Sequence, residues 1–168
     1  MTPSWLDEFL LPGGKLGLVH SPGSREATTA QDLDALSALG VQRIICLQEA
    51  FELEHFRVSE TMDQRRAAVE QRGIAFTHSP VVDRSAAGMA QAIELVALLN
   101  AELRAQRTVI VHCWAGLGRA GTLAACLLVD NEMRPENAIL EVRAARPGAI
   151  ESEEQVRFIE RFAAHVKG

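Results

Sequence analysis

The sequence predicts an α/β fold with one open, mainly parallel central sheet flanked by helices. Short apolar runs alternate along the chain with longer segments of helical periodicity. One run, Thr108–His112, is rich in β-branched residues, which is typical of a central parallel strand covered on both faces. Hydrophobic residues make up 48% of the 168 residues, enough for a sizeable core. Since no internal repeat or low-complexity linker interrupts it, we expect residues 1–168 to form a single domain.

Four segments have the pattern of strands, each a short apolar run bounded by polar or turn-forming residues. In chain order they are residues 15–20, 43–47, 74–78 and 108–112. The turn sequence Ser21-Pro22-Gly23 ends the first of them, and Ser79-Pro80 follows the third.

Six further segments have helical periodicity. They run from about residue 29 to a stop at Gly40, over 60–71, 88–105 and 119–130, from near 135, and over 152–166. Three apolar faces are predicted to meet the core: Leu33, Leu36 and Leu39; Met89, Ile93, Val96, Leu99 and Leu103; and Val156, Ile159, Ala163 and Val166. Alternating strands and helices imply right-handed crossovers, and ligands of such sheets bind beyond the carboxyl ends of the strands. The segment after Val111 is therefore where a site is expected.

Composition excludes several classes of function. Seventeen basic and twenty-two acidic side chains give a net charge of −5, which argues against nucleic acid as a partner. No apolar run is long enough to cross a membrane, and the N-terminus lacks the pattern of a secretory signal. The three cysteines have no paired spacing, which favours reduced thiols and a cytoplasmic location. Without CxxC or HExxH, neither a metal nor another cofactor is expected.

The segment after the strand 108–112 carries the strongest chemical signal. Cys113 is followed by Trp114, Ala115, Gly116, Leu117, Gly118 and Arg119, and a helix begins there. Glycines let such a loop turn its N–H groups inward as an anion-binding nest, and the helix dipole adds positive potential. Both effects favour the thiolate form of Cys113, which is then a nucleophile. The guanidinium of Arg119 can grip two phosphate oxygens. A buried, inert cysteine is the alternative interpretation.

The motif His112-Cys113-x5-Arg119 resembles the signature of protein tyrosine and dual-specificity phosphatases. The resemblance extends over most of the chain and is greatest to the kinase-associated phosphatase group (the cyclin-dependent kinase inhibitor 3 type) and to small atypical dual-specificity phosphatases. The matching stretches are residues 16–18, 21–23, 81–83, 116–119, 123–128 and 146–151. The resemblance implies a dual-specificity-phosphatase-like fold and a phosphocysteine intermediate on Cys113.

The general acid is the second part of such a site. The family carries this acid on the loop that Asp83 occupies, so the resemblance implies that Asp83 protonates the leaving oxygen. From the residues alone, an aspartate in a loop is more often a turn former. Arg84 and Ser85 are candidates for substrate contact, and solvated loop residues are the alternative.

Three further residues have two interpretations each. His112 is expected to hydrogen-bond the loop backbone and support the thiolate, rather than transfer a proton. Cys46, at the end of a strand, either traps oxidised Cys113 as a disulfide or is a buried strand residue. Gln155 resembles a family glutamine that positions the hydrolytic water, but Ser152-x-x-Gln155 also fits a helix capping box. Cys126 is expected in the core.

Ala120 departs from the family pattern. Most members carry Ser or Thr directly after the signature arginine, and its hydroxyl helps the cysteine sulfur to leave from the phosphoenzyme. Phosphatases of the regenerating-liver type resemble this sequence in having alanine there. The sequence therefore predicts slow hydrolysis of the phosphocysteine, and it leaves open whether Thr122 reaches the sulfur.

The expected function is hydrolysis of phosphate monoesters, on phosphoserine, phosphothreonine or phosphotyrosine proteins. The neutral loop side chains Trp114, Ala115 and Leu117 argue against inositol lipids, and a small phosphorylated metabolite stays open as a substrate. One alternative is a phosphate- or partner-binding module of the pseudophosphatase kind, with vestigial activity. Another is sulfur transfer of the rhodanese kind, which the spacing of Cys113 and Arg119 fits less well.

Overall fold

The computed structural model describes residues 1–6, 14–55 and 58–168 and has a five-stranded central sheet in the order β1-β2-β5-β3-β4. The strands are β1 (Ser4–Trp5), β2 (Lys15–Val19), β3 (Arg43–Cys46), β4 (Ala75–His78) and β5 (Thr108–His112). The pairs β2–β5, β5–β3 and β3–β4 are parallel, and β1 is antiparallel to β2. The mainly parallel sheet predicted from the sequence is therefore confirmed, with β5 at its centre.

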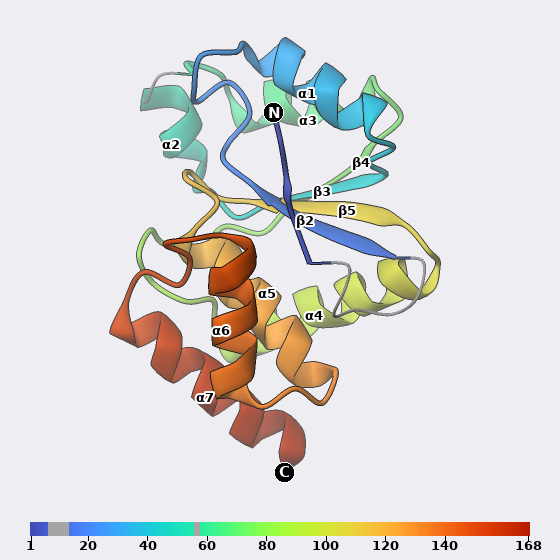
Figure 1. The fold of residues 1–168 in the computed structure, drawn as a ribbon. Helices are drawn as coiled ribbons and strands as arrows, with labels where there is room; N and C mark the ends of the chain where they lie inside the picture. The colour runs from blue at the N-terminus through green and yellow to red at the C-terminus, as the bar shows by residue number, and fades with distance from the viewer. Residues whose placement is uncertain (7–13, 56–57) are drawn as a thin grey trace.

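Helices cover both faces of this sheet (Figure 1). On one face lie α1 (Thr29–Ala38), α2 (Ala50–His55) and α3 (Met62–Glu70), and on the other α4 (Met89–Arg104), α5 (Gly118–Asp130), α6 (Pro135–Ala145) and α7 (Glu153–Lys167). Two hydrophobic cores result. The smaller packs residues such as Leu33, Leu36 and Val69 against the sheet, and the larger surrounds α5. Almost every residue of α5 is buried, as its apolar sequence predicts.

The predicted strands and helices are all present, with ends that differ by one or two residues. Two short elements are not predicted by the sequence pattern: β1, which has two residues, and α2, which has six. Both are too short to show a periodic apolar pattern.

Three predicted core residues are wrong. Leu39, Ile93 and Val166 are exposed, because Leu39 lies just beyond the end of α1, and α4 and α7 present slightly rotated faces to the core. In α7 the buried face contains Phe158 and Phe162, which the predicted face omitted. Since aromatic side chains bury the largest areas, they decide the rotation of the helix.

Side-chain caps fix the start of three helices. Thr28, Thr61 and Ser152 each accept a hydrogen bond from the backbone N–H three residues later, where a glutamine completes the capping box. Within the described ranges, no helix combines the length and apolarity that a membrane span requires.

Candidate active site

The loop after β5 lies where the carboxyl ends of three parallel strands meet. Hydrogen bonds attach it to both neighbouring strands: the Ser21 N–H donates to the Trp114 carbonyl at 2.8 Å, and the Leu47 N–H donates to the His112 carbonyl at 2.9 Å. Gly116 has φ +69°, and a Cβ there would lie 2.0 Å from the Val19 carbonyl oxygen. Glycine is therefore required for the loop to pack against β2.

A pocket of about 130 Å³ opens at this loop. Its lining residues come from the loop, the Asp83 segment and the turn before α7: Asp83, Arg84, Cys113, Trp114, Ala115, Arg119 and Glu151. Cys113 is 3% exposed and so lies deep in this pocket. The first intrahelical bond of α5 runs from the Gly121 N–H to the Leu117 carbonyl at 3.0 Å. The N–H groups of the first turn, at residues 118–120, therefore have no acceptor within the helix, and they lie beside the pocket.

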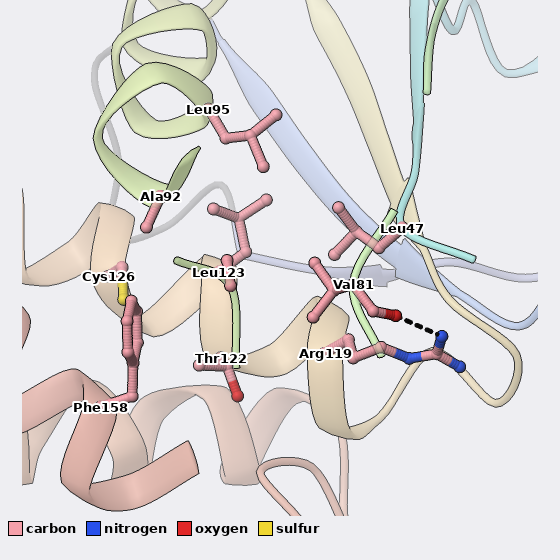
Figure 2. Close-up of a pocket in the computed structure, with 10 residues that line it drawn as sticks. Leu47, Val81, Ala92, Leu95, Arg119, Thr122, Leu123, Cys126 and Phe158 are labelled. Carbon is pink, nitrogen blue, oxygen red and sulfur yellow. Dashed lines mark hydrogen bonds between the residues drawn. The ribbon is translucent and has the colours of Figure 1, made fainter. Parts of the chain in front are cut away.

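Arg119 is held by a buried carboxylate that the sequence analysis did not identify. Its two amino groups donate to the two oxygens of Glu52 at 2.7 and 2.8 Å. One of them also donates to the Val81 carbonyl at 3.0 Å, which Figure 2 shows. The side chains of Arg119 and Glu52 are 1% and 4% exposed. Burial alone opposes the charged form, but the hydrogen bonds to Glu52 and the charge of Cys113 raise the pKa of Arg119 above its ordinary value.

Asp83 reaches the same guanidinium from the loop between β4 and α4. Its carboxylate lies 3.1 Å from an amino nitrogen of Arg119, and its side chain is 63% exposed. The same oxygen accepts a hydrogen bond from the Arg84 N–H at 2.9 Å. Arg84 itself is exposed and has φ +62°, a conformation uncommon outside glycine. The fold thus brings Cys113, Arg119 and Asp83 together around one pocket.

Gln155 caps α7 and also ties the Asp83 loop in place. The capping box with Ser152 is present, so this part of the sequence prediction is confirmed. The amide oxygen of Gln155 accepts from the Glu151 N–H at 2.8 Å, and its amide nitrogen donates to the Ser85 carbonyl at 3.0 Å. Both ends of the Gln155 amide are engaged in these bonds, so this geometry does not favour binding of the hydrolytic water by the amide. The water-positioning role of Gln155 stays a prediction.

His112 is fully buried behind the loop. Its Nδ1 lies 3.2 Å from the Cys113 carbonyl oxygen, which fits the predicted bond to the loop backbone. Burial, reinforced by the charge of Arg65, lowers the pKa of His112 from 6.5 to about 3. The imidazole is therefore neutral at physiological pH, and its Nδ1–H donates to the carbonyl.

This neutral imidazole is expected to make stability depend on pH. Between pH 6.5 and 3 the unfolded chain protonates His112 and the folded chain does not, so stability is lost as pH falls through this range. The loss approaches about 1.4 kcal/mol per pH unit below pH 6. Urea unfolding of wild type and His112→Asn at pH 7.5, 6 and 5 measures it, since the carboxylates titrate alike in both proteins. Parallel stability curves for the two proteins would contradict this origin.

The other two cysteines point away from the pocket. Cys46 packs in the core beneath α1 and α3, whereas Cys113 belongs to the core around α5. All three cysteines are free thiols. Burial raises the pKa of Cys46 to about 12, which leaves little thiolate to attack an oxidised Cys113. The disulfide role of Cys46 therefore stays a prediction that this geometry does not favour.

Cys126 is a core residue, as predicted. It borders a small apolar cavity of about 10 Å³ between α4, α5 and α7, which Phe158 also lines (Figure 2). Burial raises the pKa of its thiol, so it stays protonated. The cavity is about the size of one water molecule and has an apolar lining, so it offers no room for a substrate.

Thr122 does not replace the missing hydroxyl at position 120. Its hydroxyl donates to the Gly118 carbonyl one helical turn earlier, at 2.7 Å, so its proton is directed along the helix and not to the sulfur. Ala120 itself is completely buried. Within the described part of the chain, no three His, Cys, Asp or Glu side chains cluster in a way that could hold a metal ion.

Comparison with known proteins gives concordant similarities. Residues 21–159 match the family described as "Swiss Army Knife protein, DSP-PTPase phosphatase domain". The chain is 32% identical over 162 residues to cyclin-dependent kinase inhibitor 3 of Homo sapiens, covering 90% of this chain and 74% of that protein.

Two solved structures have the same fold. The structure of kinase associated phosphatase with its catalytic site cysteine changed to serine matches with a TM-score of 0.89 and 28% identity, over 100% of this chain and 97% of the other. Tk-PTP in the active form matches with a TM-score of 0.78 and 25% identity, over 98% and 99% of the two chains.

Proposed function

The chain belongs to the family of DSP-PTPase phosphatases and is a phosphatase, and we propose that it hydrolyses phosphate monoesters of phosphoproteins through a phosphocysteine on Cys113. The observation that carries this proposal is the convergence of Cys113, Arg119 and Asp83 on one pocket. A thiol, a buried cation and an exposed carboxylic acid are the three groups that a two-step, cofactor-free transfer of a phosphoryl group needs.

In the first step, the Cys113 thiolate attacks phosphorus from the floor of the pocket. The S–P bond forms as the P–O bond to the leaving group breaks, and Asp83 gives its proton to the departing oxygen. The N–H groups at the start of α5 and the guanidinium of Arg119 stabilise the charge on the equatorial oxygens. The bidentate bond to Glu52 keeps this guanidinium in place, so little reorganisation is needed when the substrate binds.

In the second step, water attacks the phosphocysteine. Asp83, now a carboxylate, takes a proton from the water, the S–P bond breaks and Cys113 leaves as thiolate while inorganic phosphate forms. A hydroxyl beside the sulfur would stabilise that leaving thiolate. Ala120 has none, and the Thr122 hydroxyl is bonded to Gly118, so we propose that this step limits turnover.

Ala120→Ser is therefore expected to raise turnover. One charge-assisted hydrogen bond to the leaving sulfur is worth about 1.5–3 kcal/mol, which corresponds to about ten- to a hundredfold in rate. Rapid-quench kinetics should show a burst of phosphoenzyme in the wild type and a smaller burst in the variant. Ala124→Ser, one turn further along α5 and equally buried, is the matched control. An unchanged rate, without detectable phosphocysteine in the wild type, would refute the slow second step.

The substrate class follows from the surroundings of the pocket. The side chains at Trp114, Ala115 and Leu117 are neutral and supply no cationic surface for a polyphosphorylated head group. One similar protein is named cyclin-dependent kinase inhibitor 3, which indicates that it acts on a protein kinase. This name supports a phosphoprotein as the substrate of the present chain. A small phosphorylated metabolite is the second substrate class to test.

The proposed function is tested with an aryl phosphate, a phosphopeptide panel and a panel of sugar and nucleoside phosphates. We expect hydrolysis of the aryl phosphate that vanadate inhibits, and faster hydrolysis of phosphopeptides than of the metabolites. Binding of phosphopeptides without release of phosphate would favour a binding module. Thiocyanate production from thiosulfate and cyanide would instead indicate sulfur transfer.

A further inference from the structure

The cation expected to balance the charge of Cys113 is already neutralised by carboxylates. Arg119 donates both amino groups to Glu52 and also lies 3.1 Å from Asp83. Because Glu52 alone balances the guanidinium, this group of three side chains carries no net positive charge, even when Asp83 holds the proton that it gives up in the first step. It cannot by itself explain why a thiolate and a phosphate dianion would be stable in the same pocket.

A second guanidinium reaches the loop from the other side. Arg146 follows α6 and is partly buried. One amino group donates to the carbonyl of Ala115, two residues after Cys113, at 2.8 Å. The other donates to the Ser4 hydroxyl at 3.1 Å and to the Leu18 carbonyl at 3.4 Å, which ties the loop to β1 and β2.

Every one of these acceptors is neutral. The ion pairs of residues 1–6, 14–55 and 58–168 include none for Arg146, and its Nε is buried without a hydrogen-bond partner. Burial lowers the pKa of Arg146 from its ordinary value, while the charge of Cys113 opposes that shift, so the two groups lie within electrostatic reach. A guanidinium keeps its proton at any physiological pH. Its positive charge is therefore uncompensated until a thiolate or an anion is present.

We propose that Arg146 is a positioning residue that supplies the net positive charge of the phosphate site, holding the loop through Ala115 and favouring the Cys113 thiolate and bound oxyanions. This inference rests on the proposed function and adds a residue that acts through the loop and not on the substrate.

The other charged groups around Cys113 do not fill this role. His112 is neutral, and Glu52 and Asp83 are paired with Arg119. Arg84 and Glu151 line the mouth of the pocket with opposite charges. Arg25 lowers the pKa of Arg146, so it repels that guanidinium and does not compensate it.

The test measures the ionisation of Cys113 directly. Iodoacetamide, a neutral reagent, alkylates the thiolate, and the rate for the Cys113 peptide is followed by mass spectrometry from pH 5 to 9. Arg146→Gln keeps an N–H donor for Ala115 and removes the charge, whereas Arg146→Lys keeps the charge. Arg143→Gln is the matched control, because Arg143 lies in the last turn of α6, just before Arg146, and donates to two carbonyls outside the loop.

In Arg146→Gln, the pH midpoint of alkylation is expected to rise by about one unit and the Kd for tungstate to weaken about tenfold. In Arg146→Lys and Arg143→Gln, the midpoint is expected to stay at the wild-type value. A wild-type midpoint in Arg146→Gln, or equal shifts in the Gln and Lys variants, would overturn the inference. If Arg146→Gln does not fold, a shifted midpoint in Arg146→Lys would still overturn the inference. Because neither readout needs turnover, a chain without phosphatase activity would refute the proposed function separately.

Discussion

Cys113→Ser is expected to lower turnover by about 10⁴- to 10⁶-fold while the fold is retained. The serine hydroxyl is almost fully protonated at neutral pH, and the buried His112 beside it is neutral and bonded to a backbone carbonyl, so no base activates the hydroxyl. The pocket, Arg119 and the N-terminus of α5 are unchanged in the variant, so the affinity for phosphate should persist. The variant should therefore bind phosphorylated substrates without releasing them, and steady-state assays with capture of phosphopeptides measure both effects.

Cys126→Ala is the control for loss of a cysteine. Cys126 lies in the core beside the small cavity that Arg119 also borders (Figure 2), so its truncation should cost about 1 kcal/mol of stability and leave turnover near wild type. If Cys113→Ser retained more than a tenth of the wild-type rate, Cys113 would not be the nucleophile. If Cys126→Ala lost activity to the same degree, the loss in Cys113→Ser would reflect damage to the fold.

The central strand β5, the helix α5 and the loop between them can be predicted, because short stretches of sequence are enough to identify each of them. The β-branched run of β5 and the all-apolar sequence of α5 leave few alternatives, and Cys113 and Arg119 lie at the junction between them. The two glycines of the loop indicate backbone conformations that other residues resist, and Gly116 has such a conformation, with φ +69°. These residues could therefore be brought together in one site from the sequence alone.

The surroundings of Arg119 and Cys113 could not be predicted in this way. Glu52 lies in a six-residue helix and is separated from Arg119 by 67 positions, so nothing local distinguishes it from the half-buried Glu49 and the exposed Glu54. Arg146 belongs to a stretch that matches the family, but its bond to Ala115 depends on how α6 packs beside the loop. Contacts between polar or charged groups far apart in the sequence produce no periodic pattern from which they could be predicted.

The rotation of a helix about its own axis is the second feature that the sequence does not predict reliably. Apolar positions in α7 fit more than one face, and the predicted and observed faces share Ile159 and Ala163. The observed face includes the buried Gln155, whose polar amide is accommodated by backbone groups at the start of the helix and in the Asp83 loop. A buried polar residue of this kind is satisfied by tertiary contacts, and an apolar pattern counts it as exposed.

Glu52→Gln is expected to be the most destabilising single-charge change in the described part of the chain. Removing the buried partner of an ion pair costs about 3–5 kcal/mol, and the exposed carboxylate of Asp83, 3.1 Å from the guanidinium, replaces the charge of Glu52 only in part. The amide can keep one bond to Arg119, but it loses the bidentate geometry that aims the guanidinium at the pocket. Turnover should fall about a hundredfold with the loss of this positioning. Urea unfolding and steady-state kinetics measure the two effects, and Glu54→Gln, exposed on the same helix, is the control with the same charge change.

Adding an anion shows whether the lost stability of Glu52→Gln comes from the missing negative charge or from disturbed packing. In the wild type, Arg119 already has Glu52 as its counter-charge, so bound phosphate contributes only its own binding free energy. In Glu52→Gln, the same phosphate also replaces the missing negative charge beside a guanidinium whose Nε has no partner. Inorganic phosphate should therefore stabilise Glu52→Gln more than it stabilises the wild type, as a larger shift in the urea midpoint at equal concentration. Equal shifts would show that the cost of the substitution lies in packing, and a stability equal to that of Glu54→Gln would show that the buried pair contributes little.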